Sequence, residues 1–277
     1  MQPEKWRETV DPFSLPYHSF QPLEILGYPH AGNDVFHIRG LYRGEEVRAY
    51  VKAARQPGAA IASEAAILRQ LSGPVFPLVI DEGDSDPPFS VTLAMPGERL
   101  SVLLGGNAGL ASLAFLPEYG AALAKLHRLS LPVGNQADRR FFHPPAEELL
   151  AKSDLLYLKD FFAHPPTASQ RCFCHGDFHY ANLLWRDGHI SAILDFELAG
   201  YGDRDFDIAW AMFLRPGQRF FKTEDERQAF LRGYAEHGEY DPDAVRFYTA
   251  QCYVYFLQFS GNDPEYCGYV RDWLKSL

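Results

Sequence analysis

The sequence contains no uncharged apolar run that approaches the roughly 18 residues of a membrane-spanning helix. Its first residues, MQPEKWRETVDPFSLP, lack the apolar core of a signal peptide. Four cysteines, a C-x-C pair and two singles, match neither a disulfide framework nor a paired C-x-x-C zinc site. We therefore expect a cytoplasmic protein with no membrane partner and with reduced, mostly buried thiols.

Basic residues are scarce as well. The chain has 26 Lys and Arg against 36 Asp and Glu, a formal net charge of −10, and no basic run. Because such a surface repels a phosphate backbone, we expect no nucleic-acid partner. What the chain has is 47% hydrophobic residues over 277 positions, enough for the core of one large domain or of two lobes.

The sequence pattern changes near residue 95. Residues 20–95 alternate apolar and polar positions between Gly, Pro and Asp breaks, which predicts an antiparallel sheet with one Ala/Leu-rich helix ending at Gly73. Later segments, such as PAEELLAKSDLLYLKDFFA, have helical periods. We therefore predict an α+β protein with an N-terminal domain at 1–95 and a larger, mainly helical domain at 96–277.

The densest group of reactive side chains lies in CFCHGDFHYANLLWRDGHISAILDFE, residues 172–197. His175, Asp177 and His179 alternate, and on an extended strand they would share a face and offer ligands to zinc or iron, as in a metallohydrolase. Gly176 and the YAN that follows favour a loop, which weakens this argument. We keep the metallohydrolase as the less favoured alternative.

A phosphotransferase would use more of these residues. Phosphoryl transfer needs a carboxylate that orients the attacking hydroxyl and accepts its proton, and ligands that hold Mg²⁺ on the phosphates. Asp177 and Asn182, five positions apart in one loop, suit the first task and part of the second. Asp195 follows the apolar strand SAIL, and the Asp187-Gly188 pair predicts a hairpin that returns Asp195 towards the loop.

The same chemistry requires partners in the N-terminal domain. A Lys on a strand should reach the α/β-phosphates, and a Glu on the following helix should hold it. AYVKAAR supplies Lys52 at the end of an apolar strand, and IASEAAIL supplies Glu64 on the predicted helix. Each residue alone is typical of a solvated surface. Found in the required order before Asp177, Asn182 and Asp195, they strengthen the phosphotransferase hypothesis.

The motifs HGDFHYANLLW, ILDFE and GDRDFDIAW together resemble the aminoglycoside phosphotransferase and choline kinase family, small-molecule kinases with a protein-kinase-like bilobal fold. The resemblance covers residues 20–260 and is strongest at 174–210. Two features depart from protein kinases. LGYPHAGNDVFHI lacks the G-x-G-x-x-G spacing, and the stretch after Asp195 has no A-P-E and little room for an activation segment, which favours a small-molecule acceptor.

The resemblance implies a role for each of the five residues above. Asp177 is the catalytic base, and Asn182 and Asp195 bind Mg²⁺. Lys52, partnered by Glu64, holds the phosphates of ATP or GTP. A nucleotide-binding module of the same fold that has lost the reaction is the main alternative, but such a module usually lacks at least one of these residues.

Five further positions receive more modest roles from the resemblance. His175 and Asp207 brace the catalytic loop. His179 either approaches the γ-phosphate or makes a hydrogen bond within the loop. In TLAMPGERLS, a connection between the two lobes, backbone groups around Ala94 and Met95 meet adenine.

The acceptor is less well defined. The segment RFYTAQCYVYFLQFSGNDPEYCGYVRDW is rich in aromatic rings that could hold a quaternary or protonated amine by cation–π contacts. The helical spacing of these rings is also that of a core, and this is the favoured interpretation. Relatives with these motifs phosphorylate aminoglycosides, macrolides, amino alcohols and sugars. We expect a small-molecule acceptor, with a cationic one as a candidate, and a monomer or homodimer.

Overall fold

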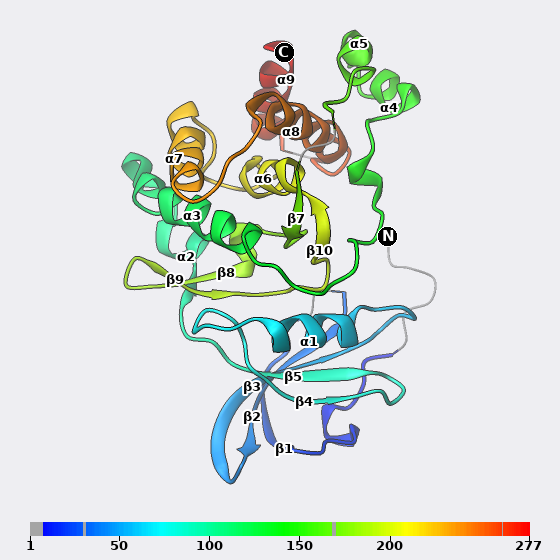
Figure 1. Cartoon of the computed structure of the whole chain (residues 1–277), viewed down its shortest axis with the longest axis vertical. Helices are drawn as coiled ribbons and strands as arrows, with labels where there is room; N and C mark the ends of the chain where they lie inside the picture. The colour runs from blue at the N-terminus through cyan, green and yellow to red at the C-terminus, as the bar shows by residue number, and fades with distance from the viewer. Residues whose placement is uncertain (1–7, 30–31, 168–169, 262) are drawn as a thin grey trace. The chain divides into compact units, whose positions relative to one another are not determined.

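The computed structural model describes residues 8–29, 32–167, 170–261 and 263–277, and the chain divides into two units (Figure 1). The N-terminal unit comprises residues 1–97 and 191–198, and the C-terminal unit comprises residues 98–190 and 199–277. The segment 191–198, which carries Asp195, thus belongs to the N-terminal unit. The expected domains, 1–95 and 96–277, placed this segment in the second domain. The two domains themselves stay a prediction.

The N-terminal unit is built on a five-stranded antiparallel sheet in the order β1-β2-β3-β5-β4. Its strands are β1 (Phe20–Gly27), β2 (Asp34–Tyr42), β3 (Glu45–Ala53), β4 (Val79–Gly83) and β5 (Phe89–Leu93). Alternate residues of β2 and β3, including Phe36, Ile38 and Val51, point into one buried cluster, as period-2 alternation requires. This core fixes the register that places Lys52 on the other face.

The helix α1 (Ile61–Gln70) packs beside β4 and β5 (Figure 1). Ala65, Ile67 and Leu68 are buried, as the apolar spacing predicts, and the helix ends before Gly73, whose φ of 128° suits glycine. Glu64 is also buried on this helix. A buried carboxylate needs a partner, and Lys52 of β3 supplies it.

The C-terminal unit is mainly helical. Its helices are α2 (Leu100–Leu104), α3 (Leu116–His127), α4 (Glu147–Lys152), α5 (Lys159–Phe162), α6 (Arg204–Met212), α7 (Glu224–Ala235), α8 (Pro242–Leu257) and α9 (Pro264–Lys275). Short 3-10 turns occupy Pro12–Ser14 in the N-terminal unit and Ala108–Ala114, Arg140–Phe142, Leu156–Leu158 and Tyr180–Asn182 here. The strands β7 (Arg171–Cys174) and β10 (Gly200–Asp203) pair antiparallel. The predicted α+β fold with a helical second part is confirmed.

A second small sheet has the order β6-β8-β9, from β6 (Glu98–Arg99), β8 (Leu183–Arg186) and β9 (His189–Ile193). The predicted hairpin at Asp187-Gly188 joins β8 to β9, and both turn residues have positive φ, 52° and 81°. The hairpin carries the chain from the C-terminal unit into the segment 191–198.

The aromatic residues of α8 lie mainly in the core, which is the interpretation that their helical spacing favoured. Phe247 and Tyr253 are buried in a cluster with residues of α6 and α9, whereas Phe259, just beyond α8, is exposed. The predicted helical segment PAEELLAKSDLLYLKDFFA is broken into α4, a 3-10 turn and α5, with Asp154 at a φ of 57° between them. Within the described ranges, none of the helices has the length and hydropathy of a membrane span.

Candidate active site

Lys52, on β3, is the centre of an ion cluster within the N-terminal unit. Its Nζ lies 2.8 Å from Oε2 of Glu64, 2.9 Å from Oδ1 of Asp195 and 3.1 Å from Oε2 of Glu197. Burial alone lowers the pKa of Lys52, but the three carboxylates outweigh burial and raise it above its usual value. Lys52 is therefore a permanent cation that gathers these carboxylates.

The cluster sets one cation against three carboxyl groups, and burial raises the pKa of Glu64. A bound divalent cation would offset negative charge that Lys52 alone does not balance. The side chain of Asp195 is 42% exposed, compared with 8% for Glu64 and 25% for Glu197. Asp195 is thus the carboxylate that can best reach an ion, and its hard oxygens suit Mg²⁺. Glu197, two residues after Asp195, also accepts hydrogen bonds from the Asn33 amide.

The backbone around Asp195 is held in an uncommon conformation. Asp195 has a φ of 65°, a left-handed value that is costly for a residue with a Cβ. The next residue, Phe196, donates its N–H to Oε1 of Glu64 at 3.1 Å, and its ring packs edge-on against Phe76. Glu64 therefore holds both Lys52 and the segment that presents Asp195.

Ala94 and Met95 follow directly after β5. The N–H of Ala94 donates to the carbonyl oxygen of Arg48 on β3 at 2.9 Å, so this amide is already used by the sheet. Its carbonyl and the backbone of Met95 are the groups left for the predicted contact with adenine.

In the C-terminal unit, Asp177 lies in the loop that follows β7. Its Oδ1 accepts a hydrogen bond from Nε1 of Trp210 at 2.7 Å. Its Oδ2 accepts one from Nδ2 of Asn182 at 3.2 Å and lies 3.4 Å from Nε2 of His179. Since the amide nitrogen of Asn182 faces Asp177, its amide oxygen is the atom that can face a cation.

The charge state of Asp177 follows from these contacts. Burial acts to raise its pKa, but the hydrogen bond and charge of His179, the charge of Arg215 and the Trp210 N–H outweigh burial and hold the pKa well below its usual range. Nδ1 of His179 accepts from the N–H of Ala181, so a neutral His179 carries its proton on Nε2, facing Asp177. Asp177 is therefore an oriented anion at neutral pH.

Asp207, on α6, holds the start of this loop. Its two carboxylate oxygens accept the backbone N–H groups of His175 and Gly176, each at 2.9 Å. Nε2 of His127 lies 3.1 Å from the same carboxylate. Burial acts to raise the pKa of Asp207, but His127 and the other donors outweigh it and lower the pKa. Asp207 therefore braces the loop that carries Asp177. His175 itself accepts the N–H of Asp177.

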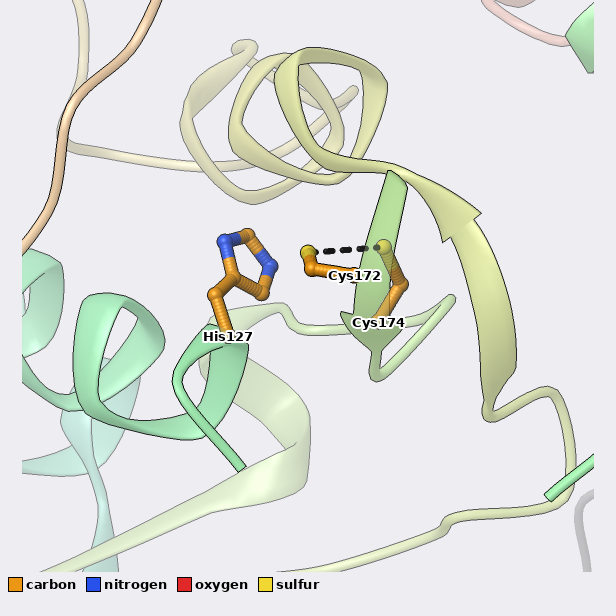
Figure 2. Close-up of side chains that lie close together, drawn as sticks. All are labelled: His127, Cys172 and Cys174. Carbon is orange, nitrogen blue, oxygen red and sulfur yellow. Dashed lines mark hydrogen bonds between the residues drawn. The ribbon is translucent and has the colours of Figure 1, made fainter. Parts of the chain in front are cut away.

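His175, Asp177 and His179, the ligands of the alternative metal site, do not bring their ligand atoms together. Among the described residues, the group of three potential ligands whose atoms lie within 4.8 Å of one another is His127, Cys172 and Cys174 (Figure 2). The two thiols are 3.7 Å apart. Both ring nitrogens of His127 are engaged, by Asp207 and by the hydroxyl of Tyr234 at 2.7 Å. The cluster is therefore part of the support behind the loop, and its thiols are free as expected.

Three residues near Asp177 were not predicted from the sequence to belong to the site. Trp210 donates a hydrogen bond to Asp177, and the charge of Arg215 lowers the pKa of Asp177. Arg139 donates to the carbonyl oxygen of Gly176 at 2.7 Å. The guanidinium carbons of Arg139 and Arg215 lie 5.2 and 5.3 Å from the centre of the Trp210 ring. One signal was available, because Trp210 is three positions after Asp207 and so shares its face of α6.

These features define a protein of the protein-kinase-like class, with a strand lysine held by a helix glutamate and an aspartate loop after a strand of the helical part. The sequence pattern of the phosphotransferase enzyme family (APH) matches residues 28–248, so the chain belongs to this family. The resemblance noted from the motifs is thereby confirmed.

Solved structures of kinases share the fold. Aminoglycoside phosphotransferase APH(4)-Ia is 17% identical, with a TM-score of 0.64 over 93% of this chain and 94% of that one. Amicoumacin kinase hAmiN, solved with AMP-PNP, Ca²⁺ and Ami, is 14% identical, with a TM-score of 0.59 over 94% and 89%. Macrolide 2′-phosphotransferase MphH from Brachybacterium faecium is 17% identical, with a TM-score of 0.55 over 91% of each chain. A comparison with curated proteins finds no match.

Proposed function

We propose that this protein transfers the γ-phosphoryl group of ATP or GTP to a hydroxyl group of a small molecule. The observation that carries the proposal is Asp177, a carboxylate kept ionised and held on both oxygens by Trp210, Asn182 and His179. Such a group can accept a hydrogen bond from an attacking hydroxyl and fix its direction. The similar solved structures are named as an amicoumacin kinase, a macrolide phosphotransferase and an aminoglycoside phosphotransferase, and these names support the reaction class.

Orientation counts for more than basicity in this site. A carboxylate of low pKa is a weak base, but phosphoryl transfer passes through a loose transition state in which the hydroxyl loses its proton late. Asp177 would therefore align the hydroxyl oxygen first and take the proton as the new P–O bond forms. Its ionised state means that it does not need a basic pH for this role.

The nucleotide and metal are assigned to groups in both units. Lys52, fixed by Glu64, would contact the phosphates, and the carbonyl of Ala94 with the backbone of Met95 would contact adenine. The carboxylate of Asp195 and the amide oxygen of Asn182 would hold Mg²⁺, which when bound neutralises charge on the transferring phosphoryl group. His175 and Asp207 keep the loop in place. ATP supply favours the cytoplasm, and the oligomeric state stays a prediction of monomer or homodimer.

The test is Asp177→Asn, which keeps the shape of the side chain and removes its charge. We expect acceptor-dependent formation of the nucleoside diphosphate to fall by at least ~10²-fold, while Mg–ATP binding, measured by calorimetry, is retained. Asp187→Asn is the matched control, because Asp187 lies exposed in the hairpin turn, where asparagine also accepts a positive φ. Equal turnover in the two variants would contradict the assignment of Asp177. Tight Mg–ATP binding with no turnover on any acceptor would favour the inactive module.

A further inference from the structure

Residues 134–143 form a connection between β10 and α8 of the C-terminal unit. The N–H of Gln136 donates to the carbonyl oxygen of Tyr201 on β10 at 3.0 Å. Nε2 of Gln251 on α8 donates to the carbonyl oxygen of Phe141 at 2.6 Å. A residue between these two hydrogen bonds is therefore held in place relative to both elements.

Arg139 lies between these two hydrogen bonds and reaches the loop that carries Asp177. Its Nη2 donates to the carbonyl oxygen of Gly176 at 2.7 Å. Its guanidinium carbon lies 4.6 Å from the centre of the Phe142 ring and 5.2 Å from that of the Trp210 ring. Burial lowers the pKa of Arg139 and the charge of Asp177 opposes that effect, but arginine stays charged at neutral pH in either case.

The peptide group between Gly176 and Asp177 is held at both of its polar atoms. Arg139 binds its carbonyl oxygen, and its N–H donates to Nδ1 of His175 at 3.2 Å. Gly176 has a φ of 80°, and glycine has wide conformational freedom, so without such bonds this peptide could rotate. Because the Cα of Asp177 follows directly, the orientation of the peptide sets the direction in which the carboxylate points.

The same guanidinium acts on the other support of Asp177. Trp210 donates its Nε1–H to Oδ1 of Asp177 at 2.7 Å, and Arg139 lies over the ring that carries this donor. A cation over an indole ring is attracted to it and restrains its orientation. One side chain therefore contacts both the backbone and the hydrogen-bond donor that hold Asp177.

We propose that Arg139 is a positioning residue for Asp177, and that it sets the rate of phosphoryl transfer through the Gly176 peptide and the Trp210 ring. Arg139 does not itself touch the reacting atoms in this role. A small misplacement of a group that aligns a nucleophile costs up to about 10²-fold in rate. Nucleotide binding, assigned above to other residues, should not depend on Arg139. This inference rests on the proposed function.

Three variants test the proposal. Arg139→Met removes the charge and the donors and keeps the length of the side chain. Arg139→Lys keeps a charge and a donor for the Gly176 carbonyl, but it has no planar group to lie over Trp210. The matched control is Arg140→Met, because Arg140 is the next residue and also lies over aromatic rings, with its guanidinium carbon 4.8 Å from the centre of the Phe141 ring.

The first measurement is hydrogen exchange of the Trp210 indole N–H by NMR, with its signal assigned from Trp210→Phe. We expect exchange at least ~10-fold faster in Arg139→Met, because the bond to Asp177 opens more often, and no change in Arg140→Met. Loss of a nearby positive charge alone would slow base-catalysed exchange, so the direction is diagnostic. The buried indole of Trp185 is the internal reference for general loosening of the fold.

The second measurement is ADP formation from Mg–ATP with water as the acceptor. We expect kcat to fall by about 10- to 100-fold in Arg139→Met with KM for Mg–ATP unchanged, a partial recovery of kcat in Arg139→Lys, and the full rate in Arg140→Met. The exchange measurement needs no nucleotide, so it decides the role of Arg139 even where hydrolysis is slow.

The inference is overturned by unchanged exchange at Trp210, by equal acceleration at Trp185, or by an unchanged kcat in Arg139→Met. A full rate of hydrolysis in Asp177→Asn would instead overturn the proposed function. The two failures are therefore distinguishable.

Discussion

Replacing Trp210 with phenylalanine tests how Asp177 is held. The change removes one N–H donor, at 2.7 Å from Oδ1 of Asp177, and keeps an aromatic ring between Arg139 and Arg215. A hydrogen bond to a charged group contributes about 1.5–3 kcal/mol. We therefore expect the free energy of unfolding to fall by about that amount beyond the loss of packing, and kcat to fall by about 10-fold.

The control for packing is Trp185→Phe. Trp185 is buried, as Trp210 is, at 1% and 5% exposure, but its Nε1 has no hydrogen-bond partner among the described residues. Both variants lose the same ring atoms, so the difference between their urea-unfolding free energies measures the bond to Asp177. We expect Trp210→Phe to be the less stable variant by at least ~1.5 kcal/mol at pH 7.

The pH dependence gives a second check on the same bond. The pKa of Asp177 is lowered in the folded protein, so its contribution to stability is complete above the unfolded value of about 3.9 and is lost as pH falls through the folded value. The gap between the two tryptophan variants should accordingly be full at pH 7 and shrink below about pH 4. Equal stabilities at pH 7, or a gap that persists in acid, would refute the argument that Trp210 holds an ionised Asp177.

Two further predictions concern the ion cluster and the helix packing. Lys52→Met leaves Glu64 buried without its cation, so we expect a loss of about 3–5 kcal/mol in urea unfolding and weaker Mg–ATP binding by calorimetry; unaltered values would contradict the cluster. A Cβ on Gly233 of α7 would overlap the carbonyl oxygen of Pro117 on α3, so Gly233→Ala should lower the melting temperature, whereas Gly268→Ala, with open space in α9, should raise it slightly.

Local sequence was enough for the features that depend on neighbouring residues. The Asp187-Gly188 turn could be predicted because its backbone conformation is set by those two residues. The alternation of β2 and β3 and the apolar spacing of α1 follow from single-element periodicity. Asp177 and Asn182 could be paired for the same reason, since five positions of one loop separate them.

Prediction was poorer where packing overrides local preference. The segment 145–163 has a helical period throughout, yet Leu150, Leu155, Leu158 and Phe162 enter one core cluster from three short pieces. A continuous helix would follow from propensity, which is a weak determinant compared with burial of these side chains. No local signal at Asp154 announces its positive φ, although aspartate tolerates it better than most residues.

The sequence by itself determined the family, the α+β class and the order of the candidate catalytic residues, because these reside in motifs and in periodicity. The tertiary structure alone decided that Trp210 donates a hydrogen bond to Asp177 and that the charge of Arg215 acts on it. It also decided that Glu197 joins Glu64 at Lys52 and that segment 191–198 belongs to the N-terminal unit. It further decided that the guanidinium groups of Arg140 and Arg215 lie over aromatic rings and that Arg219 lines a cavity. Contacts between residues far apart in the chain depend on how whole elements pack, and packing leaves no periodic trace in a single sequence.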